Sequence, residues 1–195
     1  MASPSDPCSW REDAKLALSA YVLLLLRRGR LGRKGLAGLL DVGEATGRTI
    51  LSKLKAAGLA GSDRGGAYLT AEGEAEAGSL SNLVELAEAE LPERYGGATA
   101  CLIIKDSCEG LGSAVVHRDE AVKGGADGAL ILVRRGGRLV FPDSSYEYPV
   151  RVVPEPPEGA CVLITWASSR AQAVNGAMRA AGSILCASRR RGAAP

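Results

Sequence analysis

Histidine and the side-chain amides are nearly absent from this sequence. The 195 residues contain one histidine (His117), one glutamine (Gln172) and two asparagines (Asn82 and Asn175). Any serine or cysteine triad would have to be built around His117, so we predict no enzyme activity. The shortage of thermolabile amides is typical of thermophilic proteins, although a GC-rich genome produces the same bias.

The cysteines lack a metal-binding or redox spacing, since no two of them form a CxxC pair. Their number is odd and no signal peptide precedes them, so reduced thiols in a cytoplasmic protein are the simplest expectation. The longest apolar run, residues 17–26, is too short to cross a bilayer, and we predict no membrane contact. We expect Cys101 and Cys161, which lie in apolar runs, to be small core residues. The five positions are Cys8, Cys101, Cys108, Cys161 and Cys186.

Charge is unevenly distributed along the chain. Between Arg11 and Thr70 there are eleven Lys/Arg residues against five Asp/Glu, whereas residues 71–92 hold six glutamates and no basic residue. The overall charge of +2 hides this contrast. A basic segment is the expected place for a phosphate-binding surface.

The first half of the chain predicts helices followed by a hairpin. Apolar residues at helical spacing predict helices over 13–28, 33–40 and 44–57, and Gly29 and Gly58 are the expected stops of the first and third. A Gly-rich turn between residues 59 and 69 predicts a β-hairpin. A long helix from Ala71 to Leu91, capped by Thr70 and ended by Pro92, should follow. The residues expected to face inward from the second and third helices are Leu36, Leu39, Leu40, Ile50, Leu51 and Leu54.

Two segments carry a resemblance to winged helix-turn-helix regulators of the MarR and PadR type. They are GRTILSKLKAAGL (residues 47–59) and RGGAYLT (residues 64–70), which are similar to the recognition helix and the wing of that family. The usual spacer before the final Leu-Thr pair is missing, so the wing is short. The resemblance implies a domain over residues 11–92 that binds double-stranded DNA, and a homodimer paired through the long helix after the wing.

The polar face of the third helix supplies most residues of this predicted interface. With the apolar face of the third helix inward, short polar and basic side chains point outward, as a recognition helix requires. Arg48 and Thr49 suit base edges, because arginine pairs with guanine and the threonine methyl contacts thymine. The remaining cations would contact phosphates. The predicted DNA-binding residues are Arg33, Lys34, Thr46, Arg48, Thr49, Ser52, Lys53, Lys55 and Arg64. The alternative is an adaptor that docks on protein partners, with these charges as a solvated face.

The second half predicts a smaller α+β domain over residues 98–188, with a mixed sheet. Strands are expected at 99–105, 128–134, 138–141, 151–153 and 160–166. Residues 170–188 should form a closing helix with an alanine-rich inner side, capped by Ser168 or Ser169. A flexible arm (residues 1–10) and a basic tail (residues 189–195) complete the predicted organisation, α+β in class.

This half carries a second resemblance. The segments RDEAVKGGADGA (residues 118–129) and RLVFP (residues 138–142) are similar to a motif in an archaeal two-domain family, with an N-terminal winged helix and a C-terminal domain of unknown function. The resemblance implies an archaeal transcription regulator and brings no ligand or catalytic residues with it.

Three further patterns occur in the second half. Arg118, Asp119 and Lys123, before two glycines, would bind a small anionic effector, or else form a surface ion-pair cluster, which we favour. Cys108 and His117, with Asp106, have no metal-ligand spacing, so we predict neither a metal nor a cofactor. The glycine-rich stretch at residues 109–113 lacks the ending of a phosphate loop, and we assign it no nucleotide.

Overall fold

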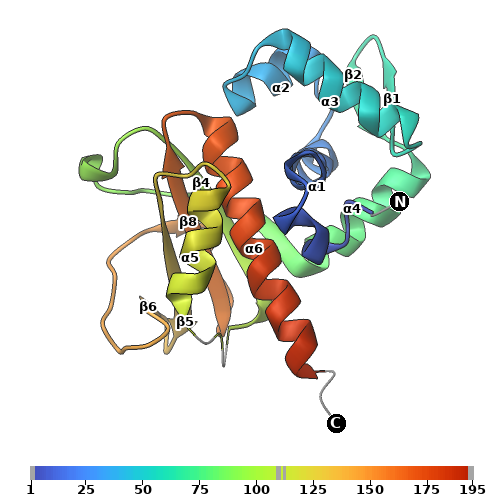
Figure 1. Cartoon of the computed structure of the whole chain (residues 1–195). Helices are drawn as coiled ribbons and strands as arrows, with labels where there is room; N and C mark the ends of the chain where they lie inside the picture. The colour runs from blue at the N-terminus through green and yellow to red at the C-terminus, as the bar shows by residue number, and fades with distance from the viewer. Residues whose placement is uncertain (1–2, 109–110, 112, 193–195) are drawn as a thin grey trace.

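The computed structural model describes residues 3–108, 111 and 113–192, and its first part is helical (Figure 1). A short 3-10 turn, η1, precedes three helices, a two-stranded antiparallel hairpin and a fourth helix. Local capping explains where several begin, since Asp13 accepts hydrogen bonds from Lys15 N and Leu16 N, and Thr70 accepts one from Gly73 N. The elements are η1 (Pro7–Arg11), α1 (Ala14–Arg28), α2 (Arg33–Leu40), α3 (Glu44–Ala56), β1 (Ala60–Asp63), β2 (Gly66–Leu69) and α4 (Ala71–Leu83).

Helix α1 is the centre of this first part. It is buried on nearly all sides, rather than along one stripe, because the other helices surround it (Figure 1). The inward residues predicted for α2 and α3 are buried, with one exception. Leu39 is 48% exposed, because α2 is only eight residues long and Leu36, Ala37 and Leu40 already fill its inner face.

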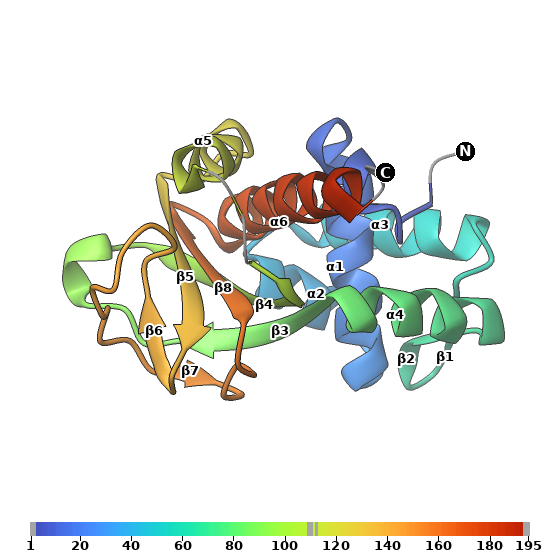
Figure 2. The same cartoon turned by 90° about the horizontal axis from the view of Figure 1, so that it is seen from below.

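The predicted long helix over residues 71–91 is wrong in its second part. Helix α4 ends at Leu83, and strand β3 (Val84–Ala89) follows without a break (Figure 2). Val84 and Leu86 point into the core in alternation, and β3 pairs antiparallel with β4 from Val84–Ile104 to Ala87–Cys101. Pairing with a distant strand therefore overrides the local preference of a Glu/Ala-rich segment for a helix.

The second part contains an antiparallel sheet with strand order β6-β5-β8-β4-β3-β7. Every strand pairing among the described residues is antiparallel, so the expectation of a mixed sheet is wrong. Helix α5 connects β4 to β5, which run parallel to each other, but β8 inserts between them and pairs with both. The elements are η2 (Glu93–Tyr95), β4 (Ala98–Ser107), α5 (Ala114–Lys123), β5 (Gly128–Arg135), β6 (Arg138–Val140), β7 (Val152–Val153), β8 (Ala160–Ala167) and α6 (Arg170–Gly192).

Helices α5 and α6 cover one face of this sheet, and α6 also contacts η1 and α1 (Figure 2). One apolar core runs from α1 through α6 to the inner face of the sheet. A second, smaller cluster lies on the outer face beneath the segment 141–152, with Leu132, Val162 and Ile164 at its centre. Strand β3, which precedes the boundary expected at residues 92–98, belongs to the sheet, and α6 extends to Gly192, past its expected end.

The N-terminal arm is packed, not loose as predicted. The indole of Trp10 is fully buried and donates a hydrogen bond to Pro4 O at 2.8 Å, while Ser5 N donates to Glu76 on α4. Pro7 lies against Gly182 of α6, where a side chain on the glycine would clash with its carbonyl. The arm therefore joins α4 and α6.

Four of the cysteines form disulfides, which overturns the expectation of reduced thiols. Cys8 pairs with Cys186, with 5.2 Å between their Cα atoms, and Cys108 pairs with Cys161, with 5.6 Å. The partners are 178 and 53 residues apart in sequence, so no local spacing reveals them. Cys101 is a buried free thiol, as its apolar surroundings predict. Within the described residues no helix combines the length and apolarity that a membrane crossing requires.

Candidate nucleic-acid interface

Helix α3 presents a polar ridge away from its core. Ile50, Leu51 and Leu54 are buried beneath it against the first part of the chain, as predicted. Helix α2 approaches α3 closely at Gly47, where an added Cβ would lie 2.9 Å from the carbonyl oxygen of Arg33. This contact holds α2 and α3 at a fixed angle, so the exposed side chains of both helices share one surface.

All nine residues predicted to bind DNA are exposed. Three of them, Arg48, Ser52 and Lys55, are spaced i, i+4, i+7 and line the side of α3 that faces the hairpin. Lys55 Nζ donates to Ser62 Oγ on β1 at 2.7 Å, which ties the helix to the hairpin. Thr49 Oγ1 donates to Ala45 O at 2.9 Å, so its hydroxyl is occupied and its methyl is the group left for a partner.

The hairpin is anchored by Arg30, which lies between α1 and α2. Its guanidinium pairs with Asp63 and lies over the ring of Tyr68, 5.0 Å from the ring centre. The hydrogen bond from Arg30, with another from Gly65 N, holds the pKa of Asp63 below its ordinary value. Arg64, at the tip between the strands, is exposed.

A groove of about 270 Å³ separates α3 from the hairpin. Arg33, Arg48 and Lys55 line it, and Asp63 is the acid on its wall. Arg33 also contacts Glu44 at 3.4 Å. This exposed ion pair contributes little to stability, so Arg33 can readily exchange the Glu44 carboxylate for another anion. From Arg30 to Gly66 there are seven basic and three acidic residues, so the surface is positive.

The residues proposed for an effector do not converge on a cavity of their own. Arg118 and Asp119 are exposed on α5, and Lys123 Nζ pairs with Glu120 at 2.8 Å. The glycines after them serve packing, because Gly124 lies against Gly176 of α6, with 2.7 Å from an added Cβ to that Cα atom. Among the described residues, Lys123 of this set forms an ion pair and Arg118 and Asp119 do not, and the partner of Lys123 is the buried Glu120.

Glu120, the acid beside these residues on α5, is buried, whereas the sequence predicts a surface cluster. It is 3% exposed and binds Arg179 of α6 at 2.9 Å, Lys123, and Arg11 of η1 at 3.5 Å. Burial alone would raise its pKa, but hydrogen bonds from Lys123 and Arg11 and the charge of Arg179 outweigh burial, and the pKa lies below its ordinary value. The cluster crosslinks three elements.

His117 is buried rather than a surface group. Its Nδ1 lies 2.9 Å from Ser183 Oγ on α6, and its Nε2 lies 3.3 Å from Leu111 O. Cys108 is in a disulfide and cannot act as a thiol or ligand beside it. The Asp106 side chain and residues 109, 110 and 112 of the glycine-rich stretch lie outside what the structure describes.

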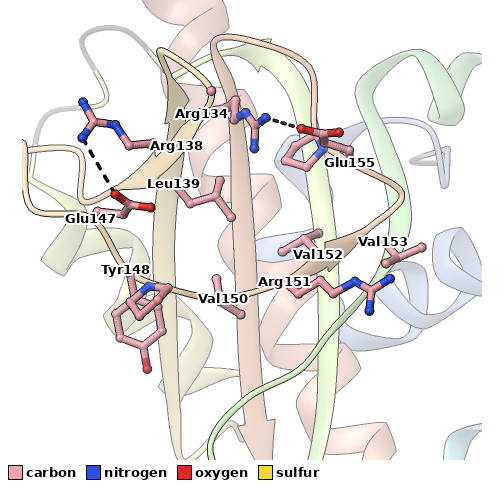
Figure 3. Close-up of a pocket in the computed structure, with 13 residues that line it drawn as sticks. Arg134, Arg138, Leu139, Glu147, Tyr148, Val150, Arg151, Val152, Val153 and Glu155 are labelled. Carbon is pink, nitrogen blue, oxygen red and sulfur yellow. Dashed lines mark hydrogen bonds and ion pairs between the residues drawn. The ribbon is translucent and has the colours of Figure 1, made fainter.

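A hollow of about 410 Å³ lies on the outer face of the sheet and is bordered by the segment 147–156 (Figure 3). Leu139, Val150 and Val152 form its apolar wall. Its three arginines are already paired with carboxylates: Arg134 with Glu155, Arg138 with Glu147 at 3.8 Å, and Arg151 with Glu90 at 3.9 Å. Because every arginine in the lining has a carboxylate partner, none of them is left to bind an anionic ligand.

Comparisons with known proteins cover most of the chain. Residues 95–184 match the model of a family described as a domain of unknown function, DUF4443. Among solved structures, hypothetical protein PH0730 from Pyrococcus horikoshii OT3 is 27% identical, with a TM-score of 0.70 over 87% of this chain and 90% of that one. A search of curated proteins finds no match. The fold therefore occurs in an archaeal protein, and its whole arrangement, not the second half alone, is similar.

Proposed function

We propose that residues 11–83 form a winged helix-turn-helix that binds double-stranded DNA, and that the protein is a DNA-binding transcription regulator. The order of three helices, a hairpin and a fourth helix supports this proposal, because it is the element order of that fold. In this assignment α3 is the recognition helix and β1–β2 is the wing. The second part of the chain is then a sensing or assembly domain.

The observation that carries the proposal is the exposed ridge of Arg48, Ser52 and Lys55 beside the hairpin. A major groove about 12 Å wide accepts one helix, and its outward side chains then face base edges. In this assignment Arg48, in the first half of α3, pairs with guanine, because N-terminal residues of a recognition helix contact base edges. Lys53, Lys55 and Arg64 flank the ridge and suit phosphates on either side of the groove.

The test is a titration of labelled duplex DNA by fluorescence anisotropy at several salt concentrations. We expect wild type to bind with an affinity that falls steeply with salt, because each phosphate contact releases a counterion. Arg48→Ala/Lys53→Ala should weaken binding by at least about tenfold. The matched control, Arg118→Ala/Arg135→Ala, removes two exposed cations from the second part of the chain and should bind like wild type.

Two results would contradict the proposal. If neither wild type nor control binds duplex at low salt, α3 is no recognition helix, and the adaptor that docks on proteins becomes the better hypothesis. Equal loss of binding in both double variants would mean that only the overall charge matters. A homodimer is part of the proposal and predicts half-sites about one helical turn apart, with a mass of two chains by sedimentation.

A further inference from the structure

A small polar niche lies where two strands of the sheet separate. The pairing of β3 with β4 stops at Ala87–Cys101; beyond it, β3 pairs with β7, while β4 continues alongside β8 to Ala98 (Figure 2). The space between them is about 200 Å³. It is lined by Ala87, Glu88, Ala89, Thr99, Cys101 and Arg170. The volume is below that of pockets for drug-sized ligands, so only a small molecule fits.

Arg170, the first residue of α6, brings an unmatched positive charge into this niche. Its Nε is buried and has no hydrogen-bond partner, and no ion pair to its guanidinium occurs among the described residues. A buried donor without an acceptor is rare in native proteins and points to a water or an ion that completes it. The planar guanidinium offers parallel N–H donors that match the two oxygens of a carboxylate or phosphate.

The other walls of the niche suit the same kind of ligand. Thr99 brings a hydroxyl and Cys101 a thiol, and both can donate to an oxygen. Burial raises the pKa of Cys101 to about 12 against the opposing charge of Arg170, so the thiol is neutral and does not repel an anion. Glu88, exposed at the mouth, is the one acid of the lining, and it forms no ion pair with Arg170 in the structure.

We propose that this niche binds a small oxyanion, held by the Arg170 guanidinium between the separated ends of β3 and β4. The site is distinct from the α3 surface and does not depend on DNA binding. A carboxylate and a phosphate share the required chemistry of paired oxygens with negative charge. Glu88 at the mouth would compete with the ligand for Arg170 and so lower its affinity.

The first measurement is the melting temperature of the full chain against acetate, inorganic phosphate and chloride at matched ionic strength. Wild type should be stabilised in a saturable manner by acetate, phosphate or both, relative to chloride, because a ligand of the folded state raises stability by mass action. Arg170→Gln should raise the apparent Kd at least about tenfold, and Glu88→Gln should lower it. Arg135→Gln, an exposed arginine elsewhere on the sheet, is the matched control and should keep the wild-type Kd.

The second measurement uses Cys101, the one cysteine outside the two disulfides, as a reporter inside the niche. Bound anion should lower the S–H stretching frequency of Cys101 in the infrared spectrum of the unreduced protein, because a neutral thiol that donates to an anion has a weakened S–H bond. Saturation by acetate alone identifies a carboxylate site, and saturation by phosphate alone identifies a phosphoryl site. If Arg170→Gln does not fold, Arg170→Lys is the alternative variant. It keeps the positive charge but loses the parallel N–H donors of the guanidinium, so it should also weaken binding. The absence of saturation by either anion, or an unchanged S–H frequency of Cys101 at saturation, would overturn the proposal and leave water as the occupant.

Discussion

Arg179 on α6 donates from Nε to Glu120 Oε2 on α5 at 2.9 Å, and this contact holds the helical layer together above the sheet. The carboxylate is 4% exposed, while Arg179 is 25% exposed, so the acid is the buried member of the pair. Arg11 reaches the same carboxylate from η1. One side chain therefore joins the N-terminal arm, the crossover helix and the last helix.

Replacing Glu120 should destabilise the protein in a pH-dependent way. Glu120→Gln should lower the free energy of unfolding by about 1–3 kcal/mol at neutral pH, because charge-assisted hydrogen bonds are lost. The folded-state pKa lies below the ordinary value of 4.5, so this stabilisation is present above pH 4.5 and is lost as the pH falls through the folded-state pKa. Urea denaturation at neutral and acidic pH measures both effects. Asp119→Asn, exposed on the same helix, should change stability by less than about 0.5 kcal/mol, and an equal effect of both variants would contradict the assignment.

The contact between α5 and α6 should not tolerate a methyl group. Gly176→Ala places a Cβ 2.7 Å from that of Ala126 and 2.8 Å from Ala121 O, which should cost about 1–3 kcal/mol of unfolding free energy. Gly78→Ala is the matched control, since Gly78 lies within α4 with nothing within 4 Å of an added Cβ. It should stabilise the protein by about 0.5–1 kcal/mol. Thermal unfolding of the two variants should therefore shift in opposite directions.

The disulfide from Cys8 to Cys186 should contribute strongly to stability. It links residues 178 positions apart, so its loss frees almost the whole unfolded chain, and Cys8→Ser should lose about 2–5 kcal/mol. Cys186→Ser and the Cys8→Ser/Cys186→Ser double variant should lose the same free energy of unfolding as Cys8→Ser, because all three variants lack the same disulfide bond. Unfolding midpoints and intact mass under non-reducing conditions test this. Additive losses in the double variant would show that the thiols act separately.

Asp63 should oppose DNA binding if α3 and the hairpin form the proposed interface. Asp63→Ala removes an exposed acid and releases Arg30, so the affinity for duplex should rise about three- to tenfold and the salt dependence should steepen by about one counterion. Anisotropy titrations against salt measure both quantities. Asp119→Ala, an acid removed from α5, should leave both unchanged. A fall in affinity on Asp63→Ala would mean that the Arg30 pair is needed to hold the hairpin in place.

Local signals in the sequence predicted much of this fold. The helices near residues 14–28, 33–40 and 44–56 and the strands of the second half follow from periodicity, glycine stops and capping residues. The exposure of the proposed DNA-contacting residues follows from the same helical spacing, because a core face on α3 requires an opposite polar face. These features depend on neighbours a few residues apart, which a single sequence displays.

Tertiary structure alone decided the features that depend on distant partners. Val84–Ala89 is a strand because β4 is beside it, and β8 lies between β4 and β5 although it follows both in sequence. The two disulfides, the packed arm around Trp10 and the carboxylate of Glu120 among three cations likewise join segments that no local pattern connects. The same holds for Arg170 beside Cys101. The sequence determined which segments are helical or extended and which of their faces is polar, because hydrogen bonding and side-chain spacing within an element involve residues close in sequence. The arrangement of those elements was decided by packing across the core, because that packing joins residues that are close in space but far apart in sequence.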